Sequence, residues 1–431
     1  MKKRYLLIGL LALVLALALV AVACGGGGAT TTAEQVTTTE QVTTTVGYPQ
    51  GSSTGPIKVG HIFDDTGVEA VVGSLVKVAV QYTLGSATVA GRPIELIEED
   101  SKSTVEGAVE AARKLVEQDQ VDVILGPTQI GQKNAVATYC AEKQVPMVLY
   151  NPTPSGPLEE NEWVIGVGGS PAQFGTCIAD YMYNVLGYRT ISTLGPEDTS
   201  GHAFFEPVTD YFTLLGGQVV QQQWAAMPTD DWSAYLTTVQ DADALVAWVG
   251  GQGIPLLTQY YDTGLYNRMP IVGAFQGFMD PWVPRNIGEA NQAAAETLLG
   301  AVCPLAWDPD SQDPANLAFI EGMTPLKPWG KPTDDGLAGP AQTGQVLLAA
   351  LESCATNLSN LSLRDALLAT SITGPEGPVS FVPGENIATK NIYIVEVALI
   401  PAAEHPEDPR LLFEYHTVKT YEAVPPHGLE Q

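Results

Sequence analysis

The sequence predicts an α/β protein with two lobes, each a parallel β-sheet flanked by helices. Apolar, strand-like runs alternate with segments of helical period, and short connections join them. Such alternation is typical of parallel sheets that carry helices on both faces. It begins near residue 57 and begins again near residue 174, and residues 57–431 are numerous enough for two domains. Two runs therefore predict two lobes.

The first run contains four predicted strands. Ile57–Phe63 reads as a buried strand, and a polar turn follows it. The helix after the second strand opens with Ser103-Thr-Val-Glu106, the pattern of a capping box, and its apolar residues then recur at helical spacing. Strands are predicted at 57–63, 93–98, 121–125 and 145–150, and helices at 71–84, 103–116 and 134–143.

The second run repeats this alternation. Its clearest helix, His202–Leu215, has an aromatic face and is stopped by two glycines. Strands are predicted at 190–194, from 219, at 244–249 and at 270–272, and helices at 174–186, 202–215, 232–239 and 254–262. Ligands of open α/β sheets bind outside the carboxyl ends of the strands. The candidate ligand loops are therefore 64–67, 126–131, 150–155, 195–201, 250–253 and 274–278.

The first 24 residues read as a secretory signal. A Lys-Lys-Arg start is followed by an apolar run from Leu6 to Ala23, nearly long enough to span a bilayer. Small residues precede Cys24, as at the end of a bacterial lipoprotein signal, although Ala21 stands where Leu is usual. We expect cleavage before Cys24, acylation of its sulfur and an extracytoplasmic, membrane-anchored protein. The alternative is an uncleaved anchor.

Residues 25–56 predict a flexible tether. They begin GGGG, are rich in Thr, contain EQVTTT twice and show no apolar periodicity. Such a segment has too little to bury to offset the entropy of ordering it. Its end-to-end distance is expected to be about 30 Å, which would hold a folded body just clear of a lipid surface.

The charge balance bears on the partners of the chain. Asp and Glu number 48 against 20 Lys and Arg, for a formal net charge of −28. Nucleic acid is therefore not an expected partner, because phosphate binding needs clustered cations.

Four cysteines besides Cys24 lie in the body, and they form no C-x-x-C pair. With only five His in the chain, we expect no zinc site, no other metal site and no cofactor. Outside the cell the four could form disulfides in three connectivities. Buried free thiols are the favoured alternative, because Cys140 and Cys177 lie on apolar faces of predicted helices. The four are Cys140, Cys177, Cys303 and Cys354.

Six segments, taken in order, resemble the type I periplasmic-binding-protein family, in its branched-chain amino acid and amide receptor branch. The likeness runs from Ile57 to about Val397. The segments are IKVGHIFDDTG, GRPIELIEED, AVEAARKLVEQDQVDVILGP, VPMVLYNPTPS, GGSPAQFGTCIADYMYNVLGYRTISTLGPEDTSG and GPEGPVSFVPGEN. The resemblance implies two lobes joined by three hinge crossovers, with a cleft that closes around ligand.

The same resemblance implies where the lobes begin and end. Crossovers are expected near 167–169, 302–305 and 373–378. Lobe 1 would then hold 57–167 and 304–375, and lobe 2 would hold 168–303 and 376–425.

In the first lobe, the resemblance points to two ligand loops. The Gly-Pro loop offers Thr128 and Gln129, together with backbone N–H groups at a helix start that suit an anion, while Ile130 stands where Ser is usual. The next loop offers Asn151, Thr153 and Ser155. Thr153 aligns best with the family's ligand threonine; its alternative role is an ordinary turn hydroxyl.

In the second lobe, the chain departs from the family. Ser200 replaces an aromatic residue, and Phe275 and Gln276 stand where an acidic residue holds the ligand's ammonium. An unpaired buried charge costs several kcal/mol, so an amino acid would need its counter-charge from Asp64, Asp65 or Asp198. Trp248, followed by Gly250, would pack against an apolar ligand part or lie in the core. An amide, a carboxylate without an amine or an aromatic compound fits at least as well.

The resemblance implies a solute-binding lipoprotein of an ABC importer that captures an amino acid, an amide or a related carboxylate. We expect it to act as a monomer and to deliver its ligand to a membrane permease. The alternative is a sensing subunit for a membrane signalling partner. Catalysis is not expected, because G-x-S-x-G, H-E-x-x-H and P-loop motifs are absent from the sequence, and Ser200-Gly-His202 is adjacency in sequence rather than triad geometry.

Overall fold

The computed structural model describes residues 54–153, 156, 158–250, 253–275, 282–326, 335–400 and 413–430. Cys24, the signal, most of the tether, Ser155 and Gln276 lie outside the described residues. In the described part of the chain, no helix is long and apolar enough to cross a membrane.

The first sheet has the strand order β2-β3-β1-β4-β5-β6, and all its neighbours run parallel except β2 and β3. Its strands are β1 Ile57–Phe63, β2 Thr88–Val89, β3 Arg92–Asp100, β4 Val123–Leu125, β5 Met147–Leu149 and β6 Val164–Gly166. Strands β1, β4, β5 and β6 are almost wholly buried because helices cover both faces of the sheet.

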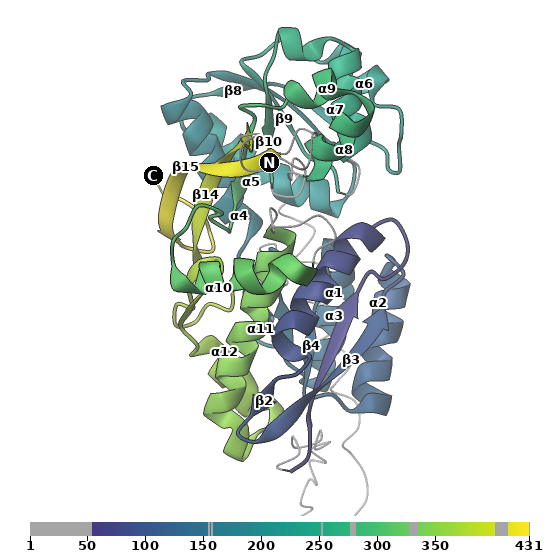
Figure 1. The fold of residues 1–431 in the computed structure, drawn as a ribbon, viewed down its shortest axis with the longest axis vertical. Helices are drawn as coiled ribbons and strands as arrows, with labels where there is room; N and C mark the ends of the chain where they lie inside the picture. The colour runs from purple at the N-terminus through teal and green to yellow at the C-terminus, as the bar shows by residue number, and fades with distance from the viewer. Residues whose placement is uncertain are drawn as a thin grey trace, which may run out of the picture. The chain divides into compact units, whose positions relative to one another are not determined.

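One face of this sheet packs against α1 together with α11 and α12, which come from much later in the chain (Figure 1). The other face packs against α2 and α3. The helices of this lobe are α1 Ala70–Leu84, α2 Val105–Arg113, α3 Ile130–Lys143, α10 Pro314–Met323, α11 Asp335–Cys354 and α12 Asn360–Leu368. Shorter turns are η1 Lys114–Asp119, η4 Thr324–Leu326 and η5 Ala355–Asn357.

The second sheet joins a parallel half to an antiparallel half. Its order is β12-β13-β14-β11-β10-β9-β7-β8, with β15 paired to β14. Strands β7 to β11 run parallel to one another, and β12 to β15 are antiparallel to their neighbours. The strands are β7 Thr190–Pro196, β8 Gln218–Ala225, β9 Ala244–Ala247, β10 Ile271–Gly273, β11 Val302–Leu305, β12 Ile372–Gly374, β13 Gly377–Ser380, β14 Thr389–Leu399 and β15 Phe413–Val424.

Helices also cover both faces of the second sheet. One core contains α4 and α5, and the other contains α6 to α9. These helices are α4 Pro171–Asp180, α5 Thr199–Leu214, α6 Ser233–Thr238, α7 Gly253–Asp262, α8 Trp282–Ala290 and α9 Gln292–Glu296, with the turns η2 Tyr181–Val185 and η3 Leu265–Asn267. The predicted fold class, two sheets of mostly parallel strands flanked by helices, is confirmed.

The predicted cap of α2 is wrong by one residue. Thr104 is the N-cap, and its hydroxyl accepts a hydrogen bond from the Gly107 N–H at 3.0 Å. Ser103 has φ of 55°, outside the extended conformation of an N-cap. Its hydroxyl instead donates to the Thr66 carbonyl at 2.9 Å. The sequence pattern S-x-x-E at 103–106 therefore does not form a capping box in the structure.

Two segments that are far apart in the sequence lie side by side next to β6. Gly166 N–H donates to the Asn386 carbonyl at 2.8 Å, and Ala388 N–H donates to the Gly166 carbonyl at 2.9 Å. Gln173, at the start of α4, donates to the carbonyls of Ala388 and Val424 at 3.0 and 2.6 Å. The segment around 166–173, where the chain passes from the first sheet to the second, is thus tied to the loop around 386–388, which joins β13 to β14.

The four cysteines of the body are buried and form no disulfide among the described residues. Cys140 lies on α3 and Cys177 on α4, and burial raises the pKa of both thiols, that of Cys140 to about 12. The favoured reading of buried free thiols is confirmed.

Candidate functional site

Each sheet has a topological switch point at the carboxyl ends of its strands. In the first sheet, β1 lies between β3 and β4, and the helices after β1 and β4 lie on opposite faces. In the second, β7 lies between β8 and β9, and the helices after β7 and β9 again lie on opposite faces. The loops after such strands are where open α/β sheets bind ligands.

Loops from the two switch points meet at Glu69. A methyl group added to Gly250, after β9, would lie 3.1 Å from the Glu69 carboxylate. The pKa of Glu69 is raised to about 7, first by burial and then by the negative charges of Asp64 and Asp198. Residues that follow β1, β7 and β9 therefore converge. Sequence reasoning missed Glu69; its place between the β1 turn and the start of α1 is the signal that points to it.

Asp64, directly after β1, is fully buried. Its Oδ1 accepts hydrogen bonds from the Ser101 hydroxyl and from Gln132 Nε2, the latter at 2.9 Å. Its Oδ2 has no hydrogen-bond partner among the described residues. Asp64 is thus held from two sides and keeps one oxygen unused.

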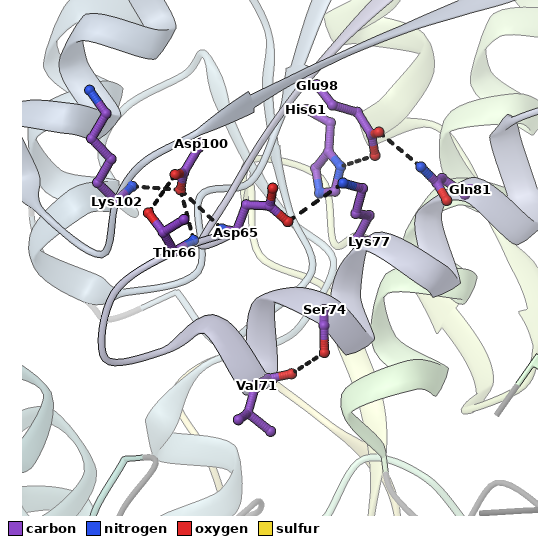
Figure 2. Close-up of polar contacts among 10 residues, drawn as sticks. All are labelled: His61, Asp65, Thr66, Val71, Ser74, Lys77, Gln81, Glu98, Asp100 and Lys102. Carbon is purple, nitrogen blue, oxygen red and sulfur yellow. Dashed lines mark hydrogen bonds and ion pairs between the residues drawn. The ribbon is translucent and has the colours of Figure 1, made fainter. Parts of the chain in front are cut away.

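Asp65 belongs to an exposed polar network at the same turn, shown in Figure 2. Its Oδ1 lies 3.5 Å from Lys77 Nζ. Asp100 accepts hydrogen bonds from the backbone of Asp65, Thr66 and Lys102 and from the Thr66 hydroxyl. Partial burial opposes ionisation of Asp100, but these hydrogen bonds outweigh it and hold its pKa below the usual value. The turn is therefore ordered by its own contacts.

The Gly-Pro loop supplies two half-buried polar side chains and one apolar side chain. Thr128 Oγ1 lies 3.2 Å from the Tyr150 hydroxyl, and Gln129 Nε2 is buried without a hydrogen-bond partner among the described residues. Ile130 is buried in a core cluster with Phe174 and Phe275 of the second lobe. Where the family resemblance places a serine, this chain therefore makes an apolar contact between the lobes.

The loop after β5 is held by buried hydrogen bonds. Thr153 is fully buried, its N–H donates to the Gly169 carbonyl at 2.7 Å, and its hydroxyl has no partner among the described residues. Asn151 is half-buried. Lys133, on α3, is buried, and its ammonium donates to the Pro152 carbonyl at 2.9 Å. Sequence reasoning missed Lys133, although its spacing from Ile130 places both on one helix face.

In the second lobe, the loop after β7 ends in a helix cap. Asp198 is exposed, and its carboxylate accepts a hydrogen bond from Gly201 N–H at 2.8 Å as the N-cap of α5. Ser200 lies in the first turn of α5 and is half-buried. His202 stacks on Trp224 at 4.2 Å between ring centroids. Residues two apart on a helix do not face each other, so Ser200 and His202 form no catalytic pair.

Aromatic side chains gather at the ends of β9 and β10. The rings of Phe275 and Phe204 stack at 4.1 Å, and Phe174 meets Phe275 edge-on at 4.9 Å. Trp248 packs against Phe204 at 4.7 Å and is half-buried. Gly250 follows Trp248 at the end of the described loop. We call Phe174, Phe204, Trp248 and Phe275 the aromatic cluster. Its member Phe275 stands at the position where the family resemblance leads one to expect an acidic residue that binds the ligand's ammonium.

A groove of about 720 Å³ lies among α3, α4, α5 and the C-terminal segment. Its lining includes Asn134, Thr176, Glu206, Tyr211 and Leu429. Most of its lining lies along these helices, and Ile130 and Thr199, at the ends of the loops after β4 and β7, also line it. No group of three or more His, Cys, Asp or Glu side chains in the described residues could hold a metal ion.

Residues 56–403 match the family described as periplasmic binding protein. The Leu/Ile/Val-binding protein homolog 6 of Brucella melitensis is 24% identical over 298 residues, covering 67% of this chain and 73% of the relative. A solute binding protein of an ABC transporter from Rhodopseudomonas palustris, solved with 3,4-dihydroxybenzoic acid, superposes with a TM-score of 0.76 at 22% identity, covering 86% and 98% of the two chains. The ABC transporter substrate-binding protein from Sphaerobacter thermophilus gives 0.75 at 23% identity, covering 85% and 98%.

The structural likenesses show a shared fold, and the family match covers well over half of the chain. The family resemblance that the six sequence segments showed, taken in their order along the chain, is therefore confirmed. This chain belongs to the periplasmic binding protein family.

Proposed function

We propose that the chain is the extracytoplasmic solute-binding component of an ABC importer. It captures a small organic solute (an amino acid, an amide or a related carboxylate) between the loops of the two switch points and delivers it to a membrane permease. The observation that carries this proposal is the convergence of polar first-lobe loops and the aromatic cluster, which Glu69 and Gly250 bring together. Cys24 would anchor the protein to the membrane.

The first lobe would hold the polar end of the ligand. Thr128, Gln129, Asn151, Thr153 and Ser155 are its candidate contacts. Gln129 Nε2 and the Thr153 hydroxyl support this role, because both are buried without a partner among the described residues, and such groups cost free energy unless something binds them.

The second lobe would hold the apolar or aromatic part. Phe275 and Trp248 are the candidate contacts, with Gly250 leaving room beside them, and Asp198, Ser200 and Gln276 border the same loops. The Rhodopseudomonas neighbour was solved with an aromatic acid, which supports an aromatic ligand. The name of the Brucella relative supports a branched-chain amino acid, for which Asp64, Asp65 or Asp198 would supply the counter-charge.

Closure of the two lobes would complete the binding cycle. Ligand would first contact the loops at 126–131 and 150–155, and the loops at 198–201, 248–253 and 274–278 would then close over it. Closure shifts a population between open and closed forms, and the closed form docks on the permease as a single subunit.

The test is thermal stabilisation of the full chain by 3,4-dihydroxybenzoate, benzoate, benzamide and leucine. A ligand at a hundredfold its dissociation constant adds roughly 2.7 kcal/mol to the free energy of unfolding. Phe275→Leu, which removes the ring at the site, should reduce the shift produced by an aromatic ligand. Phe212→Leu makes the same change in a buried helix position and should leave the shift intact. If none of the four compounds stabilises the wild-type protein, the proposed function is wrong.

A further inference from the structure

Lys133 is a buried cation without an acidic partner among the described residues. The residue is 1% exposed, and the hydrogen bond given for its ammonium goes to the Pro152 carbonyl at 2.9 Å. Burial alone lowers its pKa to about 7. An ammonium carries three donors, and a buried charge costs free energy unless it is paired. The fold therefore buries an amine that is about half protonated near pH 7, and no described side chain neutralises its ammonium form.

The position of Lys133 links the two ligand loops of the first lobe. It lies in the first turns of α3, directly after the Gly-Pro loop. Its hydrogen-bond acceptor, Pro152, precedes Thr153 in the loop after β5. Lys133 thus lies behind both loops that would hold the polar end of the ligand.

The same two loops carry two further donors without partners among the described residues. Gln129 Nε2 and the Thr153 hydroxyl are buried and have no partner among the described residues. The N-terminus of α3 also presents backbone N–H groups and the positive end of a helix dipole toward this region. Together with Lys133, these groups favour a ligand that brings oxygen acceptors and a negative charge.

The titratable groups on the surrounding elements do not fill that role. Asp64, after β1, is held by Ser101 and Gln132. Tyr150, at the end of β5, is bound through its hydroxyl to Thr128 and to the Ile62 carbonyl. The acidic residues of the neighbouring helices, Glu106 and Glu110 on α2 and Glu206 and Asp210 on α5, form no ion pair with Lys133 in the described structure.

We propose that Lys133 is a specificity-determining residue that makes the site selective for carboxylate anions over the corresponding neutral amides. The carboxylate would lie on the loops at 126–130 and 151–153, with Lys133 as the counter-charge behind them. This inference rests on the proposed function and names the substrate class of the same site. Lys133 acts as a positioning residue through the Pro152 carbonyl and by its charge.

A consequence is proton uptake on binding. An anion beside the ammonium stabilises the protonated form of Lys133 and raises its pKa from about 7. At pH 8, a protein whose lysine is largely neutral would therefore take up a proton when it binds a carboxylate. A neutral amide would cause no such uptake.

The experiment is titration calorimetry of the full chain at pH 8 in buffers of different ionisation enthalpy. The probes are two matched acid–amide pairs, benzoate with benzamide and 3-methylbutanoate with 3-methylbutanamide. In Lys133→Met, we expect the affinity for the acid to fall roughly 10- to 100-fold, as for loss of a charged hydrogen-bond partner. The affinity for the amide should change less than threefold, and the proton uptake should disappear.

Lys143→Met is the matched control, because it removes a lysine at the other end of α3 that pairs with Glu117. It should keep both the acid preference and the proton uptake. Circular dichroism and thermal unfolding check that Lys133→Met folds, and Lys133→Gln provides a second variant. Lys133→Arg, which keeps the charge, should retain part of the acid preference.

Several results would overturn the inference. If Lys133→Met lowers the affinities for acid and amide equally, Lys133 has a purely structural role. If the variant binds the acid as tightly as the wild type does, Lys133 has no role in binding. Binding of benzamide or leucine to the wild type without binding of either acid would also contradict it, while leaving the proposed function standing. If no probe, including leucine, binds the wild type, the proposed function falls and the inference falls with it.

Discussion

Glu376 and Lys390 form an ion pair in which both side chains are buried. Glu376 precedes β13, Lys390 lies on β14, and the Glu376 N–H donates to Gln342 Oε1 of α11 at 2.7 Å. The pair therefore connects the second sheet to a helix that covers the first.

Removing one charge of this pair should be strongly destabilising. Lys390→Met leaves the Glu376 carboxylate buried and uncompensated, and we expect the free energy of unfolding to fall by about 3–5 kcal/mol. Urea unfolding at neutral pH measures this loss in the free energy of unfolding. Glu376→Gln combined with Lys390→Met should recover part of the loss, because no charge is left unpaired. A double variant as unstable as Lys390→Met would contradict this account.

At the scale of secondary structure, α2 shows how a local pattern can predict the wrong cap. Ser103 and Glu106 have the spacing of a capping box, but Ser103 is drawn into the β1 turn, where it also accepts a hydrogen bond from the Glu69 N–H at 3.2 Å. Thr104 takes over the cap. A contact with a segment 34 residues earlier thus decides which hydroxyl begins the helix.

Thr104→Ala should lower the free energy of unfolding by about 1 kcal/mol, because the Gly107 N–H loses its acceptor. Glu106→Ala should change it by less than about 0.5 kcal/mol, since Glu106 is not at the third helical position of the true cap. Chemical denaturation of both variants decides between the caps. The reverse order of effects would restore the capping box at Ser103.

At the scale of the whole molecule, we predict that ionisation of Glu69 opposes closure of the two lobes. Its carboxyl faces negative charges from both lobes, Asp64 in the first and Asp198 in the second, and it lies against Gly250. Its pKa is about 7 in the folded protein and about 4.3 in an unfolded chain. Between these values the folded protein binds more protons, so stability falls as pH rises through this window and stays lower above it.

Glu69→Gln should remove this dependence. The wild type should lose thermal stability between pH 4.5 and pH 7 relative to the variant, and without ligand it should also become less compact over that range as the ionised carboxylate repels the opposite lobe. Unfolding temperature and small-angle X-ray scattering from pH 4.5 to 8 measure the two effects. Glu110→Gln, on the exposed side of α2, should follow the wild type. Parallel curves for all three proteins would exclude Glu69 as the titrating group.

The local alternation of the sequence was sufficient to predict much of the fold, and it also yields the loops proposed as the site. The strand Ile57–Phe63 begins and ends where predicted, and the helix after the second predicted strand carries the expected apolar spacing. Because strand–helix alternation implies a parallel sheet and its ligand edge, the loops after β1, β4, β7 and β9 were identifiable in advance. The individual ligand contacts within those loops remain predictions.

The sequence by itself determined the α/β class, the two sheets flanked by helices and the family, since periodicity and motif order are properties of neighbouring residues. It also gave the loops proposed as the site. Only the tertiary structure decided the antiparallel strands β12–β15, the burial of Lys133 beneath Pro152 and the approach of Glu69 to Gly250. The physical reason is that strand pairing and the pKa of a side chain depend on groups brought close by folding. Those groups lie far apart along the chain, where no local pattern records them.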